Sequence, residues 1–303
     1  MMTCRNRRTL CVAIVATLMV VAGCPSNILP TYTVLVTKDV VYGVGYVTDG
    51  AEPVVWTFKD LLLDVYEPEG APATGNPALI LVHGGSFAEE SKEQEEMVEY
   101  ARYFAQRGFV CFSIDYRLVN DWPPAPGYWD VVPLTSAAHA AMVDVKAAVR
   151  YVRANAAAYG VDPDKIALLG ESAGAIAGVT VAVTNPHEYE TDGPGFPVPE
   201  PNNFGVSPRV QAYVHLWGSA DHVLLSMSAD DPPTMIVHGD DDDNPATSFG
   251  SSERFHFALE LLNIPHEFYE ADGFGHGAWD YRLRGQGIKS LALDFLEEHL
   301  VGS

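Results

Sequence analysis

A serine between two glycines is the residue of this chain whose setting most directly suggests chemistry. Gly170-Glu171-Ser172-Ala173-Gly174 has the form G-x-S-x-G, with the apolar run ALLG before it and the small-residue segment AGAIAGVTVAV behind it. This pattern predicts a strand, a sharp turn and a helix, with Ser172 exposed at the top of a sheet as a nucleophile for acyl transfer. The alternative, an ordinary glycine-rich turn, is disfavoured by the strand and helix patterns on either side.

A second glycine-rich turn lies upstream, where His83-Gly84-Gly85-Ser86-Phe87 ends another apolar run. Glycines there allow backbone N–H groups to point at one spot, and each such donor stabilises an acyl-transfer oxyanion by about 3 kcal/mol. We expect the amides of Gly84 and Gly85 to form this oxyanion hole together with the N–H of Ala173, the residue after the serine. His83 is interpreted as a structural hydrogen-bonding residue rather than a base.

With these two motifs, the chain resembles the α/β-hydrolase family from about Val54 to its C-terminus. The resemblance is strongest to the serine carboxylesterase branch with HGG oxyanion loops, which includes bacterial feruloyl-esterase-like and hormone-sensitive-lipase-like enzymes. It rests on the segments LDVYEP, LVHGGSF, SIDYRL, DVKAAVRYVRANAAAYGVDPDKIALLGESAG and IVHGDDDD. It implies an α/β fold, with a mostly parallel sheet of about eight strands and helices on both faces.

The resemblance also implies partners for the serine, because the family order is nucleophile, acid, histidine. The family's acid follows the next-to-last strand in an HGxxD pattern, which selects Asp242 here, and His276 occupies the place of the catalytic histidine. In this scheme His276 transfers the serine proton to the leaving group and Asp242 orients the imidazole. The family's usual Val-Pro after the acid is replaced by residues 243–246, so Asp240, Asp241 and Asp243 remain alternatives to Asp242.

The sequence implies no cofactor and no metal. The acidic run Asp240–Asp243 invites a calcium interpretation, but it lacks the alternating spacing and the glycine of an EF-hand loop. The histidines outside the motifs show no zinc-ligand spacing; they are His139, His187, His215, His222, His256, His266 and His299.

The elements that must position these residues alternate between short β-branched runs and helix-length amphipathic segments, which predicts a mostly parallel sheet covered on both faces. An edge hairpin is expected over Val34–Val47 and Val54–Tyr66. Further strands are expected over Ala78–His83, Val110–Asp115, Ile166–Gly170, Val210–Trp217, Thr234–His238 and His266–Glu270. Helices are expected over Glu89–Arg107 and Ser136–Tyr159 and from near Ala173, Ser251 and Leu283.

Two irregular segments are expected to wall the site. Only about fifteen residues connect Trp217 to Pro233, so no large cap domain is expected there and the site should be shallow. Its walls are then the Asn120–Pro133 loop and the Thr184–Pro208 excursion, which is rich in Pro, Gly and Asn. The candidate aromatic walls are Trp122, Tyr128, Trp129, Trp217, Phe87 and Phe274.

The N-terminus predicts export. Basic residues precede the apolar run Thr9–Ala22, and the run ends in Val-Ala-Gly-Cys24, which resembles a bacterial lipobox. We expect residues 1–23 to be a lipoprotein-type signal peptide, 24–33 a linker and 34–303 the catalytic domain, with lipid on Cys24 as the membrane contact on the periplasmic or cell-surface side. The alternative is a plain signal peptide or short anchor, with a secreted product. Cys111 is expected to be a buried thiol.

The amino-acid composition and net charge exclude some classes of function. A hydrophobic fraction of 48% over 303 residues is that of a soluble globular chain, and the net charge of −22 would repel the phosphates of nucleic acids. We predict a serine carboxylic-ester hydrolase whose partner is a small-molecule or polysaccharide-linked ester, with short-acyl or carbohydrate-linked substrates. One alternative is a peptidase resembling the prolyl-oligopeptidase group, although no region of propeller length precedes the domain in this sequence. The other is a non-catalytic binding protein on the same fold.

Overall fold

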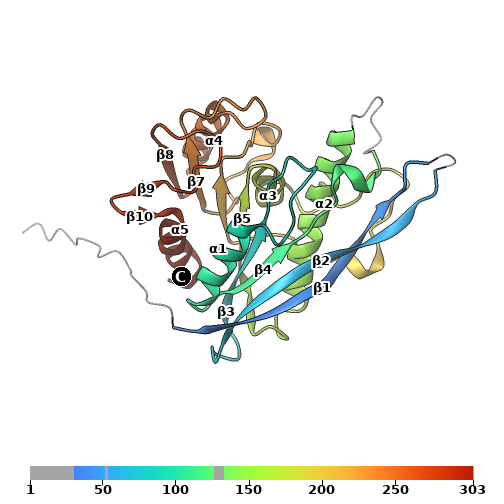
Figure 1. Cartoon of the computed structure of the whole chain (residues 1–303), viewed down its shortest axis with the longest axis horizontal. Coiled ribbons are helices and arrows are strands. Elements are labelled where there is room, and N and C mark those ends of the chain that lie inside the picture. The colour runs from blue at the N-terminus through green and yellow to red at the C-terminus, as the bar shows by residue number, and fades with distance from the viewer. Residues whose placement is uncertain (1–30, 52–53, 126–132, 303) are drawn as a thin grey trace, which may run out of the picture.

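The fold is a mixed eight-stranded sheet, seen in a computed structural model that describes residues 31–51, 54–125 and 133–302 (Figure 1). Its strand order is β1-β2-β4-β3-β5-β6-β7-β8, with β1 and β2 antiparallel at one edge and the other strands parallel to one another. The strands are β1 (Thr33–Val47), β2 (Thr57–Glu69), β3 (Asn76–Val82), β4 (Val110–Ile114), β5 (Val161–Glu171), β6 (Ala212–Leu216), β7 (Thr234–Gly239) and β8 (His266–Ala271). The predicted α/β class with a mostly parallel sheet is confirmed.

Helices cover both faces of this sheet, and alternate strand residues divide the core between them. In β3, Ile80 and Val82 pack on the side of the sheet that carries α2 (Pro133–Ala154), α3 (Ala173–Val183) and α4 (Phe249–Leu262). Leu79 and Leu81 face the other side, with α1 (Glu95–Ala105) and α5 (Ile288–Leu296). Because both faces are buried, the strand reads as a continuous apolar run.

Two helices begin later than the sequence indicates. The α1 helix starts at Glu95 instead of Glu89, because Ala88 and Glu89 donate their N–H groups to the Gly85 carbonyl in a turn that the helix cannot include. The α5 helix starts at Ile288 instead of Leu283, because the small hairpin of β9 (Arg282–Leu283) and β10 (Gln286–Gly287) precedes it. Helical periodicity extends into both loops, but their tertiary hydrogen bonds determine where each helix begins.

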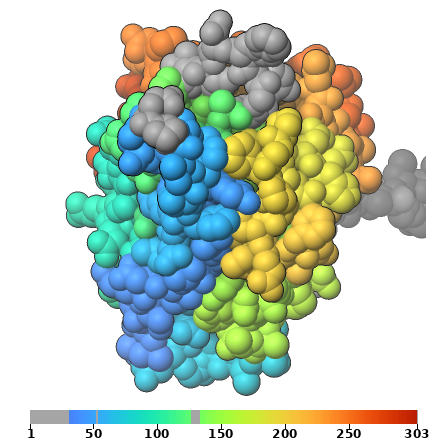
Figure 2. All heavy atoms as spheres, turned by 90° about the vertical axis from the view of Figure 1, so that its right-hand side faces the viewer, coloured from blue at the N-terminus to red at the C-terminus, as the bar shows by residue number. Residues whose placement is uncertain are grey.

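The connection from β6 to β7 contains one short 3-10 helix, Leu224–Ser226, so no large cap domain is inserted there, as predicted. Figure 2 shows the segment after α3, in yellow, lying against the blue β1–β2 hairpin. No helix in the described part of the chain is both long and apolar enough to span a bilayer. The predicted signal peptide, Cys24, Tyr128 and Trp129 lie outside the described residues, whereas Cys111 is a buried free thiol, as expected.

Candidate active site

Ser172 sits in the turn that joins β5 to α3, with φ of 53° and ψ of −117°. A Cβ atom at position 170 would lie 2.3 Å from the Gly174 carbonyl oxygen, and one at position 174 would lie 2.2 Å from the Val82 carbonyl oxygen. Only glycines allow this close approach of strand and helix. The turn therefore presents the serine hydroxyl at the carboxyl end of the sheet, in a strained conformation typical of a nucleophile.

His276 and Asp242 extend from Ser172 as a chain of hydrogen bonds. The Ser172 Oγ atom lies 2.9 Å from His276 Nε2, and His276 Nδ1 lies 2.8 Å from Asp242 Oδ2. His276 comes from the loop after β8 and Asp242 from the loop after β7, so neighbouring parallel strands deliver both side chains to one end of the sheet. Among the four consecutive aspartates, Asp242 is the one brought to His276, while Asp240 accepts the Gly273 N–H.

A second histidine holds Asp242 from the other side. His238 Nε2 lies 2.9 Å from the same Oδ2 atom, and the Asn244 N–H donates to Oδ1. Burial alone would raise the pKa of Asp242, but the hydrogen bonds from His276, the Asn244 N–H and His238 outweigh it and lower that pKa. Burial lowers the pKa of His238, which keeps this imidazole neutral, with Nδ1 against the Ser252 hydroxyl. The HGxxD motif contained His238, but its spacing did not reveal this role.

The glycine loop after β3 is attached to a buried carboxylate beside the serine. Glu171 accepts hydrogen bonds from the Trp217 Nε1–H, the Gln94 amide and the Gly84 N–H. A Cβ atom at position 84 would lie 2.2 Å from Glu171 Oε1, which explains the glycine. Burial raises the pKa of Glu171 in spite of these donors. The predicted oxyanion donor Gly84 thus has a protein acceptor for its N–H, and Trp217, a predicted wall, is fully buried beneath the site.

A cleft of about 840 Å³ opens at Ser172 and Ala173. Its apolar lining includes Phe87, Ala138, Met142 and Ile176. Polar and charged side chains also line it, including Glu188, Asp221 and His222. Of the predicted aromatic walls in the described part of the chain, Phe87 lines this cleft, whereas Trp122 is exposed next to Gly50 and Phe274 packs against Tyr281.

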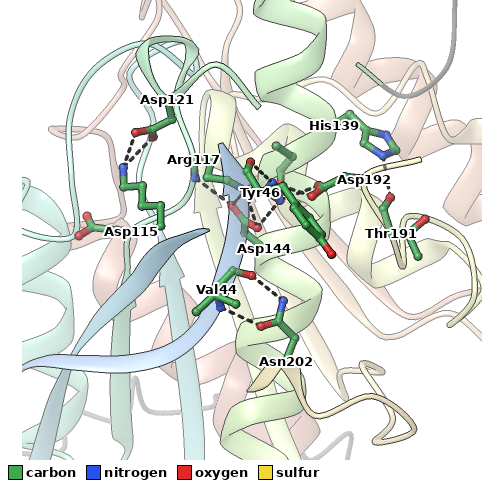
Figure 3. A network of polar contacts seen from close by, with 12 residues as sticks. Val44, Tyr46, Asp115, Arg117, Asp121, His139, Asp144, Thr191, Asp192 and Asn202 are labelled. Atoms are coloured by element: carbon green, nitrogen blue, oxygen red, sulfur yellow. Dashed lines mark hydrogen bonds and ion pairs between the residues drawn. The ribbon is translucent and has the colours of Figure 1, made fainter. Parts of the chain in front are cut away.

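The excursion after α3 supplies Glu188 and Tyr189 to the cleft, and a buried arginine fixes it in place (Figure 3). Arg117 donates both to Asp144 of α2 and to Asp192 of the excursion. His139, which lines the cleft, lies with Nε2 3.0 Å from the Thr191 carbonyl oxygen. A charged pair buried this completely is costly to break, because removing one partner leaves an uncompensated charge. The predicted wall is therefore an ordered part of the site.

Comparisons with known proteins identify the family and the fold of the chain. The model of the BD-FAE family matches residues 63–227, which is more than half of the chain. Esterase LipC of Mycobacterium tuberculosis is 32% identical over 166 residues, and para-nitrobenzyl esterase of Bacillus subtilis is 29% identical over 122 residues. These alignments cover 53% and 39% of this chain but 34% and 23% of the relatives, so the chain spans about a third or less of their length.

Two solved structures share the fold. A truncated carbohydrate esterase from gut microbiota superposes with a TM-score of 0.64 and 22% identity, covering 90% of this chain and 98% of the other. Thermogutta terrifontis esterase 2, phosphorylated by paraoxon, superposes with a TM-score of 0.61 and 22% identity, covering 84% and 91%. Both alignments cover a larger share of the chain than the family model does, and they show that the fold is shared over most of its length.

Proposed function

Because this chain belongs to the BD-FAE family, we propose that it is a serine carboxylesterase that works through an acyl-enzyme. The observation that carries the proposal is the unbroken hydrogen-bonded chain from Ser172 through His276 to Asp242, at the mouth of a half-apolar cleft. A strained serine, a base within hydrogen-bond distance and a carboxylate behind the base are the groups that acyl transfer requires.

The geometry supports two half-reactions. Ser172 Oγ attacks the ester carbonyl carbon while its proton passes to His276 Nε2, and the resulting imidazolium protonates the departing alcohol as the C–O bond breaks. Water then attacks the acyl carbon, His276 takes the proton of this water, and the acid leaves as that proton returns to Ser172 Oγ. Throughout, Asp242 accepts the Nδ1–H of His276, which fixes the tautomer and stabilises the imidazolium.

The conformation of the glycine loop determines which backbone N–H groups can bind the oxyanion. The Gly84 N–H is directed at Glu171, so its contribution is to hold the loop in place. We assign the oxyanion to the N–H groups of Ala173 and Gly85, together with that of Ser86, because Ser86 and Ala173 both line the cleft beside Ser172. Each such donor lowers the barrier by about 3 kcal/mol when it is aimed at the developing charge.

The cleft favours esters with a short acyl group or a carbohydrate-linked alcohol. Its apolar side chains suit an acyl chain, and its polar and charged side chains offer hydrogen-bond partners for a hydroxylated alcohol. A neighbour in fold is named a carbohydrate esterase, which is consistent with that class. Anchoring through lipid on Cys24 is part of the proposal, since a tethered enzyme on the outer side of a membrane would meet such esters.

Hydrolysis of p-nitrophenyl acetate and butyrate, and of an acetylated xylo-oligosaccharide, tests the proposal. The wild-type chain should hydrolyse all three, Ser172→Ala should be inactive, and Ser290→Ala, a control on α5, should keep full activity. The melting temperature of Ser172→Ala should stay near that of the wild type, since only a hydroxyl is removed. Residual turnover in Ser172→Ala, or cleavage of prolyl p-nitroanilides without ester hydrolysis, would contradict it.

A further inference from the structure

We propose that His256, His266 and Glu260 form a binding site for a divalent transition-metal ion of the Zn²⁺ class, remote from Ser172. One potential ligand atom from each of the three side chains lies within 4.8 Å of the other two. Two imidazoles and one carboxylate are a donor set that Zn²⁺ binds in proteins, often with a fourth position open to water.

The local fold explains why these residues meet although they are separated in sequence. His256 and Glu260 stand one turn apart on α4, so both point from the same face of the helix. The helix ends at Leu262, Asn263 adopts a left-handed conformation, and the Ile264 N–H donates back to the Leu259 carbonyl. This tight link brings the chain back beside the helix and places His266, the first residue of β8, against His256.

The hydrogen bonds of His266 resemble those of a metal ligand. Its Nδ1 atom lies 2.8 Å from the Ile264 carbonyl oxygen. A backbone carbonyl can only accept, so Nδ1 carries the proton and Nε2 presents a lone pair to His256. Donation from the other ring nitrogen to a backbone carbonyl is the arrangement that orients histidines bound to metals.

When both imidazoles are neutral, two hydrogen-bond acceptors, His256 Nε2 and Glu260 Oε1, face each other. His256 Nδ1 is 2.9 Å from His266 Nε2 and must donate its proton there, which leaves His256 Nε2 without a hydrogen. That lone pair is 3.7 Å from Glu260 Oε1, which also accepts only. A cation that replaces the proton between His256 Nδ1 and His266 Nε2 binds both imidazoles, and His256 then carries its proton on Nε2, where the Glu260 carboxylate can accept it. Ligand atoms on tetrahedral Zn²⁺ are about 3.4 Å apart. The two ring nitrogens lie 2.9 Å apart, and the exposed Glu260 side chain, with a carboxylate oxygen within 4.8 Å of the histidine ligand atoms, can rotate to join them.

The site lies at the end of the sheet opposite to the reaction. His266 pairs with Thr234 at the start of β7, whereas Asp242 follows the end of that strand. The ion would therefore join α4 to β8 and would not contact the ester. Phe268, two residues after His266, packs on the His256 ring at 5.0 Å and gives the site a rigid base. A ligand that binds only the native state raises the melting temperature by an amount that grows with the logarithm of its concentration above Kd.

Equilibrium dialysis of the chelator-treated full chain against ZnCl₂, with thermal melting in parallel, tests this inference. We expect one zinc equivalent in the wild type that raises the melting temperature reversibly with EDTA, and its loss in His266→Ala and His256→Ala. Glu260→Gln, at an exposed position, should fold normally and bind more weakly. The control His187→Ala removes a histidine that is 88% exposed and should keep the equivalent.

Cobalt spectra separate this site from the cysteines near the N-terminus. Co²⁺ bound by imidazole and carboxylate gives visible d–d bands without the near-ultraviolet charge transfer of thiolate ligands. Those bands should weaken in Glu260→Gln and disappear in either histidine variant, while ester hydrolysis stays at the wild-type rate with or without metal. No bound equivalent in the wild type, or an equivalent that survives all three substitutions, would overturn the assignment.

Discussion

Two clusters in this molecule contain the same groups, two imidazoles and one carboxylate, in different arrangements. At the proposed catalytic end, the Asp242 carboxylate lies between His276 and His238 and its side chain is 1% exposed. At the opposite end, His256 and His266 contact each other and the Glu260 side chain is 56% exposed at the margin. One carboxylate is therefore fully hydrogen-bonded by its neighbours, and the other has room to move.

The difference shows how position, rather than residue type, determines what such groups can do. The Asp242 carboxylate is buried and accepts hydrogen bonds on both of its oxygens, so it orients the two imidazoles that donate to it. Two imidazoles that share one proton have a lone pair to offer and gain from a cation. The first cluster is thus suited to proton transfer, and the second to chelation.

The largest expected effect is on kcat, and it distinguishes the carboxylate of Asp242 from that of Glu260. Asp242→Asn should lower kcat by about 10⁴-fold, because an amide cannot orient and stabilise the His276 imidazolium as a carboxylate does. Glu260→Gln should leave kcat unchanged, since it lies at the other end of the sheet. Steady-state kinetics of both variants on one ester measures this difference in kcat.

The neighbouring aspartates provide the controls for this position. Asp240→Asn, Asp241→Asn and Asp243→Asn should each change kcat by less than about tenfold, because none of them contacts His276 in the structure. A crippled Asp240→Asn, Asp241→Asn or Asp243→Asn beside an active Asp242→Asn would show that another carboxylate serves the histidine.

The sequence predicted the catalytic end better than the opposite end, for a physical reason. Ser172, Asp242 and His276 each follow a strand directly, so motif and strand order together bring them to one edge. The roles of His238 and Glu171 depend on contacts with distant elements, although both residues stand inside the motifs. His256 and His266 meet only through the turn at Asn263, which zinc-ligand spacing does not describe. The start of α1 was predicted too early because the N–H groups of Ala88 and Glu89 bond to the Gly85 carbonyl, in a turn that helical periodicity does not reveal.

Acid should destabilise the protein through its buried neutral imidazoles. Burial lowers the pKa of His215 to about 3 and that of His83 to about 4. Their unfolded pKa is near 6.5, so the unfolded state takes up protons first as the pH falls. The stability that these two groups contribute is complete above pH 6.5 and is lost as the pH falls from 6.5 to the folded pKa, by roughly 3 kcal/mol for His83 and about 5 kcal/mol for His215.

Urea unfolding at pH 7 and pH 4.5 measures this loss. His215→Gln should show a smaller difference in unfolding free energy between the two pH values than the wild type, because one group that titrates on unfolding is gone. The exposed control His187→Gln should show the wild-type difference. An equal pH dependence in His215→Gln and wild type would mean that this imidazole is already charged in the native state.

A third carboxylate, Glu171, extends the comparison to the oxyanion loop. Glu171→Gln offers one acceptor oxygen to three donors, so the Gly84 N–H, Gln94 or Trp217 loses its partner. We expect a decrease in kcat of about 10- to 100-fold with little change in KM, since a displaced oxyanion donor costs mainly transition-state stabilisation. A KM effect alone would assign Glu171 to substrate binding instead.

The smallest effect concerns His238, the second imidazole of the catalytic cluster. His238→Phe keeps the ring volume but removes the donor to Asp242 Oδ2, whereas His238→Gln can retain an N–H there. Loss of one hydrogen bond to a charged group costs about 1.5 kcal/mol, which corresponds to roughly tenfold in kcat. The His276 N–H and the Asn244 N–H still hold Asp242 in the Phe variant, so the loss of kcat should be far smaller than in Asp242→Asn.

Because the His238 bond also lowers the pKa of Asp242, the acid limb of the kcat profile should move to higher pH in His238→Phe and stay in place in His238→Gln. If both variants lost activity equally with unchanged pH profiles, His238 would be a packing residue, and the catalytic cluster would contain a single working imidazole.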